Sequence, residues 1–337
     1  MKGATTWHGK REGRKLRTST CVRHHVQISA RGLDWWLSDE SKQEHWCKMR
    51  AVHKFRCPDR LGVLASISGL ITRRGGNMYS FDLHVDTDAE DEPMFMSRAE
   101  FTFDPKTWPM EQVTQEFRQL GWSWNARESK VHVPGLENQL RVGLLFSSQQ
   151  HCLNEVIQRW DAGELRCQIP CAVSNHALPS QNPIHRMFER HQVKFRHIQQ
   201  RGQDEEDEML EAVKDTDILV LARYMRVLSP RFLERYGKDI INIHHGLLPS
   251  FKGANPYKQA YQKGVKIIGA TAHFVTEELD EGPIIEQLVE RVGHRDSLAS
   301  FAFRSRALER QCLFNALQYY LDHRIMRYSM NRVAVLN

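Results

Sequence analysis

Short apolar runs that alternate with helix-like segments constrain the fold of this chain more than any other feature. The run at 217–222 is almost entirely apolar, as expected for a strand that is buried on both faces of a sheet. The same part of the chain has strand-like runs at 141–146, 167–174 and 193–198 and helix-like segments at 153–160 and 204–214. A β-α-β-α order of this kind predicts a parallel sheet with helices on both faces. Residues 135–327 are therefore expected to form an α/β domain with a mostly parallel sheet.

Four polar side chains lie where strands of such a sheet are expected to end. Side chains alternate along the run 240–244, so Asn242 and His244 project to one face and the isoleucines beside them to the other. His273 lies in the next strand-like run, and Asp280 lies in the turn that follows it. Ligands bind at the carboxyl ends of the strands in open α/β sheets. We therefore expect these side chains to share one crevice.

An amide, an imidazole and a carboxylate together suit one kind of reaction. Attack on an acyl or formyl carbon places negative charge on the carbonyl oxygen, and the amide of Asn242 can donate a hydrogen bond to it. The reaction also moves a proton to the leaving nitrogen, a role for which histidine is suited because its ordinary pKa lies near neutrality. His244 is the candidate for that role. Asp280 is the carboxylate that would orient the imidazole or a water molecule.

Simpler interpretations of the same residues remain open at this stage. An Asn-x-His pair at a strand end also occurs as a hydrogen-bonded structural pair, and Asp-Glu-Gly-Pro is also an ordinary turn. The 17 histidines are scattered, and the chain has no His-x-x-x-His or Cys-x-x-Cys ligand pair. The sequence therefore predicts no metal site.

The segment 221–287 resembles the catalytic domain of the formyltransferase family. The shared motifs are Asn-x-His, a Leu-Leu-Pro-x-x-x-Gly loop at 247–253, a downstream Asp and the segment 221–230, which belongs to the folate pocket in that family. The resemblance implies a catalytic trio of Asn242, His244 and Asp280, with His273 in support. It also implies folate-binding residues at Met225, Arg226, Val227 and Leu228. One position departs from the family, because Gly246 stands where the family usually has Ser.

The segment 51–134 predicts a smaller α+β domain. Strand-like runs at 51–57, 77–86, 95–103 and 125–133 and helix-like segments at 61–71 and 110–120 follow one another in a β-α-β-β-α-β order. This order predicts a ferredoxin-like sheet with both helices on one face. The first helix is expected to face the sheet with an apolar stripe that includes Leu61, Leu64, Ile67 and Ile71.

The turn at 58–62 and Cys57 before it read Cys-Pro-Asp-Arg-Leu-Gly. This motif resembles the ACT domain, a module that senses amino acids. The resemblance implies an effector site near Asp59 and Gly62, with glycine or methionine as the effector, and a homo-oligomer, because ACT ligands usually bind at subunit interfaces. An alternative is that the domain only supports dimerisation. An ACT-like domain followed by a Rossmann-like formyltransferase domain resembles the formyltetrahydrofolate deformylase family across residues 50–327.

This family resemblance implies the hydrolysis of 10-formyltetrahydrofolate to tetrahydrofolate and formate, with the folate as substrate and no bound cofactor. Two alternatives stay open: formyl transfer from the same folate to an amine, and a catalytically silent regulator that binds folate or an amino acid. The strand–helix junction at 147–152 contains no glycine, whereas a phosphate-binding loop generally needs one. Family members that formylate glycinamide ribonucleotide have a Gly-rich loop there. The junction therefore favours water as the acceptor.

Charge and composition limit the partners and the compartment. Residues 1–33 carry eight basic side chains and one acidic side chain, a net +7, so the rest of the chain carries −1 of the total of +6. A nearly neutral body does not support a nucleic-acid surface, and the absence of a long apolar run predicts no membrane partner. Seven cysteines without paired spacing favour a reducing compartment. Residues 1–50 are expected to be a basic extension, and their Arg-rich, acid-poor composition indicates mitochondrial import, with a cytoplasmic protein as the alternative.

Overall fold

The computed structural model describes residues 48–87, 92–199, 203–253, 255–329 and 331–337. Nearly all of the extension expected at 1–50 lies outside these described residues, so the structure does not bear on it. Among the described residues, no helix is both long and apolar enough to span a membrane.

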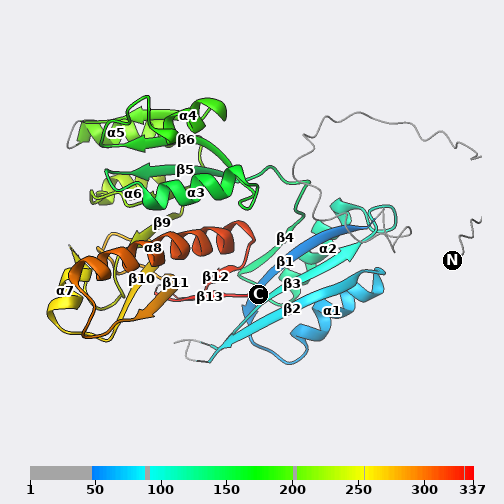
Figure 1. The fold of residues 1–337 in the computed structure, drawn as a ribbon. Helices are drawn as coiled ribbons and strands as arrows, with labels where there is room; N and C mark the ends of the chain where they lie inside the picture. The colour runs from blue at the N-terminus through cyan, green and yellow to red at the C-terminus, as the bar shows by residue number, and fades with distance from the viewer. Residues whose placement is uncertain (1–47, 88–91, 200–202, 254, 330) are drawn as a thin grey trace, which may run out of the picture. The chain divides into compact units, whose positions relative to one another are not determined.

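The N-terminal elements form a four-stranded antiparallel sheet with two helices (Figure 1). They are β1 (Met49–Pro58), α1 (Val63–Arg73), β2 (Asn77–Asp86), β3 (Met94–Phe103), α2 (Met110–Ser123) and β4 (Glu128–His132). The strand order is β2-β3-β1-β4. Both helices contribute to one apolar core with the sheet, in which Phe117 of α2 and Ile67 of α1 pack with Phe55 of β1. The helices therefore cover the same face, as the β-α-β-β-α-β order predicts.

The apolar stripe predicted for the first helix is wrong at two positions. Helix α1 begins at Val63, after Gly62 in a left-handed conformation with φ of 97°. Leu61 therefore precedes the helix and is fully exposed, and Leu64 is 44% exposed. The buried positions are Val63, Ile67 and Ile71, which are spaced by four residues as one helix face requires. The prediction of Ile67 and Ile71 is confirmed, and Val63 takes the buried position at the start of the helix in place of Leu61 and Leu64.

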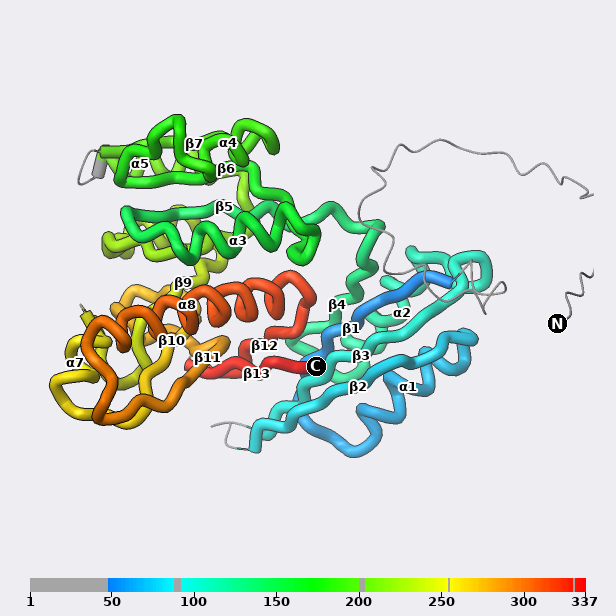
Figure 2. Tube along the Cα trace, viewed as in Figure 1, coloured from blue at the N-terminus to red at the C-terminus, as the bar shows by residue number. Residues whose placement is uncertain are grey.

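The second sheet has seven strands in the order β11-β10-β9-β8-β5-β6-β7 (Figure 2). Its strands are β5 (Arg141–Phe146), β6 (Gln168–Ser174), β7 (Lys194–His197), β8 (Ile218–Ala222), β9 (Ile240–His244), β10 (Ile267–Phe274) and β11 (Ile284–Arg291). Its helices are α3 (His151–Asp161), α4 (Pro183–Arg190), α5 (Gln203–Val213), α6 (Pro230–Tyr236), α7 (Pro256–Gln262) and α8 (Leu298–Leu321). Strands β7, β6, β5, β8 and β9 are parallel, and β10 and β11 extend the sheet by antiparallel pairing. The predicted mostly parallel α/β sheet is confirmed.

Strand β8 shows that helices cover both faces of this sheet. All five of its residues are buried. Val220 belongs to a core with α3 and α8, and Leu219 and Leu221 belong to a second core with α5 and α6. Alternate side chains of one strand therefore reach opposite helix layers. Three short helices, α4, α6 and α7, and a two-stranded sheet of β12 (Ile325–Arg327) and β13 (Val333–Val335) were not predicted.

Four buried histidines make the stability of this fold depend on pH. Burial lowers the pKa of His53, His132, His245 and His323 to about 3 each, from an ordinary value of 6.5. Below pH 6.5 the unfolded chain binds protons that the folded chain does not bind until about pH 3, so the folded state loses stability as the pH falls. We expect the free energy of unfolding to drop by about 1.4 kcal/mol for each such histidine and pH unit. Urea unfolding at about pH 7.5 and about pH 5.5 measures this difference.

His53 offers a matched variant for that measurement. Its ring lies 4.1 Å from the ring of Phe117 and 5.4 Å from that of Phe55, so His53→Phe keeps an aromatic ring in the core. Ser129 Oγ loses its bond to His53 Nε2 but still donates to Phe117 O at 2.7 Å. The variant should therefore show a smaller loss of stability between the two pH values than the native chain. An equal loss in both proteins would show that His53 does not titrate in this way.

Candidate active site

The pairing of β9 with β10 brings two predicted site residues into contact. Asn242 lies opposite His273 in the antiparallel register, and Asn242 Nδ2 is 3.2 Å from His273 Nε2. His273 Nδ1 is 2.9 Å from the backbone oxygen of Phe274. Burial lowers the pKa of His273, so its imidazole is neutral, donates from Nδ1 and accepts from the Asn242 amide at Nε2. This bond fixes the nitrogen of the amide toward His273 and leaves its second hydrogen available.

Asp280 connects His244 to the turn after β10. Its backbone is left-handed, with φ of 59°, and its side chain is only 6% exposed. Asp280 Oδ2 lies 3.3 Å from His244 Nδ1, and Oδ1 lies 3.7 Å from His273 Nε2. Burial alone would raise the pKa of Asp280, but the hydrogen bond and charge of His244 and the N–H of Gly253 outweigh it and lower the pKa. Asp280 is therefore a carboxylate at neutral pH.

Both ring nitrogens of His244 face oxygen atoms. Nδ1 faces Asp280, and Nε2 is 3.1 Å from the backbone oxygen of Phe251. Two acceptors are satisfied together only when both nitrogens carry a proton. The carboxylate of Asp280 and the carbonyl of Phe251 therefore hold the ring of His244 from both sides. The structure thus brings together the three residues predicted as a trio, together with His273.

The loop after β9 explains how the chain accommodates Gly246. Thr271 Oγ1 donates to Gly246 O at 2.9 Å and accepts from Leu248 N at 3.0 Å. A Cβ atom at position 246 would lie 2.6 Å from Pro256 Cβ and 3.0 Å from His244 Nε2. A serine would therefore require Pro256 to move, whereas glycine leaves room for it and for the imidazole. Thr271 supplies the loop with side-chain hydrogen bonds without a serine hydroxyl.

Comparison with known proteins places this geometry in a family. A model of the Formyl transferase family matches residues 140–317. Formyltetrahydrofolate deformylase 1, mitochondrial, of Arabidopsis thaliana is 48% identical over 285 residues, which cover 84% of this chain and 87% of the relative. The chain belongs to the formyltetrahydrofolate deformylases.

Two further deformylases show that the similarity extends over both sheets. The formyltetrahydrofolate deformylase of Synechocystis is 39% identical and matches over 83% of this chain and 95% of its own length. The crystal structure of a formyltetrahydrofolate deformylase from Pseudomonas syringae pv. tomato superposes with a TM-score of 0.76 at 33% identity. It covers 88% of this chain and 96% of its own. The similarity therefore includes the N-terminal sheet as well as the seven-stranded one.

The segment expected to bind folate in a deformylase follows β8, as predicted. Met225 and Val227 are 54% and 69% exposed, whereas Leu228 is 7% exposed and packs in a core with α5 and α6. Arg226 forms an ion pair with Glu205. Met225 and Val227 are therefore the apolar side chains of this segment that face the surface.

A second group of buried polar residues was not predicted. Glu309 of α8 lies 2.7 Å from His151 Nε2 and 3.4 Å from Arg223 Nε. These residues come from three distant parts of the chain, so no sequence spacing reveals the group. One signal was present, because Glu309 occupies a position on the same helix face as the buried residues Ser305, Cys312 and Leu313. A carboxylate on a buried helix face requires a partner.

Two clusters in the described part of the chain combine residue types that bind metals in other proteins. They are His132, Glu137 and His323, and His151, Cys152 and Glu309. Their side chains already have partners: His132 Nδ1 is 3.1 Å from Glu137 Oε2, and Glu309 pairs with Arg223. Burial is the main cause that lowers the pKa of His132, and the positive charges of Lys130 and Lys54 lower it further. Positive charges at this place also disfavour a bound cation. We assign no metal to either cluster.

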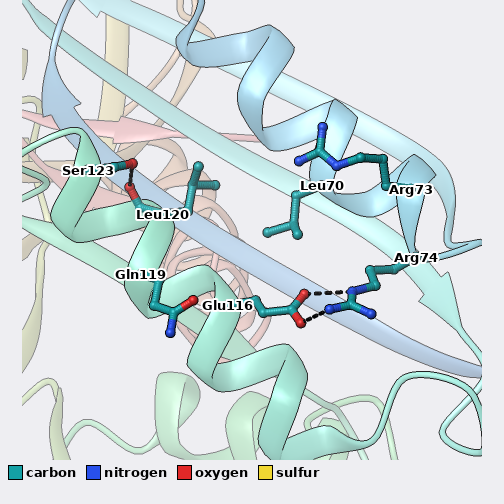
Figure 3. A pocket seen from close by; sticks show the side chains of 7 residues that line it. All are labelled: Leu70, Arg73, Arg74, Glu116, Gln119, Leu120 and Ser123. Carbon is teal, nitrogen blue, oxygen red and sulfur yellow. Dashed lines mark hydrogen bonds and ion pairs between the residues drawn. The ribbon is translucent and has the colours of Figure 1, made fainter.

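A groove of about 590 Å³ lies between α1 and α2 of the N-terminal domain (Figure 3). Its lining residues are Leu70, Arg73, Arg74, Glu116, Gln119, Leu120 and Ser123. Arg74 Nε donates to Glu116 Oε2 at 2.9 Å, which links the two helices (Figure 3). The groove includes neither Asp59 nor Gly62 and none of the residues around Asn242, so we place no part of the active site there.

Proposed function

We propose that this chain hydrolyses 10-formyltetrahydrofolate to tetrahydrofolate and formate, and that Asn242, His244 and Asp280 carry the reaction. The observation that supports these roles is the contact of the Asp280 carboxylate with His244 beside the fixed amide of Asn242. Family membership supports the substrate. We infer that Met225 and Val227 contact the folate, because they are the exposed apolar side chains of the segment after β8.

The reaction needs one bond to form and one to break. The oxygen of a water molecule held by Asp280 bonds to the formyl carbon, and negative charge develops on the formyl oxygen. Asn242 donates its second amide hydrogen to that oxygen, and the imidazolium of His244 stabilises it. The carbon–nitrogen bond then breaks, and His244 Nε2 delivers to the folate nitrogen the proton that it otherwise donates to the Phe251 carbonyl. The attacking water replaces that proton on His244. Formate leaves as the anion, and the remaining water proton passes to solvent.

His273 supports this arrangement without contacting the reacting atoms. It is 2% exposed and accepts a hydrogen bond from Asn242. Because a neutral imidazole that donates from Nδ1 can only accept at Nε2, it selects the orientation of the Asn242 amide. The NH₂ group, rather than the amide oxygen, then remains beside His273.

Release of formate from 10-formyltetrahydrofolate without any added amine tests this function. A deformylase releases many formate molecules per chain under these conditions. A transformylase that requires an amine acceptor releases none, and a silent regulator binds the folate without turnover. Failure to exceed one formate per chain would therefore contradict the proposal.

We also propose that the N-terminal domain is an ACT-like sensor whose site includes Asp59 and Gly62, with glycine or methionine as effector and a homo-oligomer as the assembly. Coupling between two sites is typically about 1–3 kcal/mol, so the effector should change turnover several-fold. At Gly62, φ is 97° and a Cβ atom would lie 3.7 Å from Trp124 Cη2. Gly62→Leu should therefore distort the turn and abolish the response, with turnover in the absence of effector retained.

Gly75 provides the matched control for this substitution. Its φ is also positive, at 72°, and no atom lies within 4 Å of an added Cβ. Gly75→Leu introduces similar backbone strain in the same domain away from the turn at 58–62, so it should retain the response. If neither glycine, methionine nor any other amino acid changes turnover, dimerisation is the remaining role for the domain.

We propose that the basic segment at 1–50 directs the protein to mitochondria. Its net +7 within residues 1–33 contrasts with a nearly neutral remainder, and import sequences are basic and poor in acids. Residues 1–50 fused to a fluorescent reporter should colocalise with a mitochondrial dye. A diffuse cytoplasmic signal would contradict the proposal.

A further inference from the structure

Helix α8 carries a buried carboxylate that the proposed reaction does not use. Glu309 is 2% exposed. Its Oε2 lies 2.7 Å from His151 Nε2 and 3.4 Å from Arg223 Nε, and its Oε1 accepts a hydrogen bond from Ser305 Oγ at 2.9 Å. Burial alone would raise the pKa of Glu309, but the hydrogen bond from His151 and the charge of Arg223 outweigh it and lower the pKa. Glu309 is therefore an ionised group paired with buried Arg223.

The partners of Glu309 belong to the ends of neighbouring strands. His151 is the first residue of α3, which follows β5. Arg223 directly follows β8, which pairs with β5. His245 directly follows β9, is 6% exposed and interacts electrostatically with both Arg223 and Glu309. One carboxylate therefore contacts the first residue of α3 and the residue after β8, with the residue after β9 beside them.

Arg223 is the residue through which Glu309 can act on folate binding. It has a left-handed backbone, with φ of 64°, a conformation that arginine adopts only when its surroundings hold it. The segment 225–228 begins two residues later. Met225 N donates to Ser147 Oγ at 3.0 Å, and Ser147 Oγ donates to Asn175 Oδ1 at 2.7 Å. The start of this segment is thus tied on one side to the residue after β5, and on the other to α8 through Arg223.

The alternative is that Glu309 only stabilises the fold. A buried ion pair rarely stabilises a fold more than apolar residues of the same size, and the neighbouring buried positions Cys312 and Leu313 on α8 are apolar. Arg223 lies two residues before the surface segment 225–228, so the charge of Glu309 can act on the backbone of that segment. Among the residues that the structure describes, Glu309 contacts His151, Arg223 and Ser305 rather than the trio around His244, so it can affect binding without taking part in the chemistry.

We infer that Glu309 is a positioning residue for folate: through Arg223 it fixes the backbone that presents Met225 and Val227 to the substrate. The inference rests on the proposed function, since the segment is assigned to folate on that basis. It assigns no catalytic role to Glu309. Its loss should therefore weaken substrate binding more than it slows the bound substrate.

Steady-state kinetics of formate release by Glu309→Gln tests this inference. Glutamine keeps the size of the side chain and removes its charge. Misplacing a binding element by about 1 Å can cost up to about 100-fold, so we expect KM for 10-formyltetrahydrofolate to rise about tenfold or more, with kcat nearly unchanged. Ser305→Ala is the matched control, because it removes a hydrogen bond to Oε1 on the same helix without touching the contacts of Oε2. It should leave both constants near the native values.

A double variant shows whether Glu309 acts through Arg223. If it does, Arg223→Gln together with Glu309→Gln should raise KM no more than the more severe single variant, because both remove one interaction. Glu309→Gln alone leaves the buried charge of Arg223 without its partner, whereas the double variant removes both charges. The double variant can therefore be measured if Glu309→Gln fails to fold. Fully additive effects would contradict action through Arg223.

The outcomes separate this inference from the proposed function. No formate from the native chain contradicts the function itself. A native chain that turns over, with a Glu309→Gln variant whose KM is unchanged, contradicts only the positioning role. A variant that loses kcat with KM unchanged also contradicts it, because the carboxylate would then act on the chemical step.

Discussion

Replacing Asn242 with alanine is expected to lower kcat for formate release by about 100- to 1,000-fold, the usual effect of removing one donor to a developing oxyanion. The amide of Asn242 is fixed by His273 at 3.2 Å, so its second hydrogen has a defined direction. Methyl in its place offers no donor. The change removes one partly buried hydrogen bond, which contributes about 1 kcal/mol to stability, so the chain should still fold.

Asn154→Ala is the control for this measurement, because Asn154 is an exposed asparagine on α3. It should keep native turnover. Circular dichroism and the urea midpoint of Asn242→Ala should remain close to those of the native chain. A folded Asn242→Ala variant with nearly native kcat would remove Asn242 from the mechanism.

Replacing Asp280 with asparagine is expected to cost about 100- to 10,000-fold in kcat, the range of general acid–base catalysis. The carboxylate lies 3.3 Å from His244 Nδ1 and is the charged partner that favours an imidazolium there. Asparagine keeps the shape but removes the charge, and it no longer orients the attacking water as a carboxylate does. His244 would then lose both its partner and its proton supply.

The pH dependence of this variant gives a second test of Asp280. The pKa of Asp280 lies below its ordinary value of 3.8, so the native side chain stays ionised from about pH 5 to about pH 8. The ratio of native to Asp280→Asn activity should therefore stay well above one over that range. A ratio that falls toward one near pH 5 would mean that the native carboxylate is protonated there. Glu281→Gln is the matched control, since that neighbouring acid pairs with Lys252 at the surface.

The strands of the site could be predicted from local sequence patterns. Strand β9 was visible as a short β-branched run, and the alternation of side chains within it placed Asn242 and His244 on one face. Strand β8 was visible because all five of its residues are apolar. Both patterns arise from neighbouring residues along one strand. The contact of Asp280 with His244 was expected from the rule that ligand sites gather at the ends of parallel strands, and from the resemblance to the formyltransferase family.

The remaining features depend on contacts between distant residues or on short elements. Glu309 meets His151 and Arg223 only after α8 packs on the sheet, so no local spacing encodes their contact. Helices α4, α6 and α7 each begin with proline, which suits the first turn of a helix but also occurs in loops. Each of these helices has only seven or eight residues, which is too short to show a helical period, so the proline alone does not distinguish a helix from a loop.

Hydrolysis in water enriched in oxygen-18 tests the central claim most directly. Purified protein is incubated with 10-formyltetrahydrofolate, without an amine, and the formate is analysed by mass spectrometry. Attack by a water molecule predicts repeated turnover, with at least one solvent oxygen in every formate released and an equal amount of tetrahydrofolate. Asn242→Ala and Asp280→Asn should reduce this labelled formate in proportion to their loss of kcat. No formate until an amine is added, with the formyl group recovered on that amine, would contradict the account.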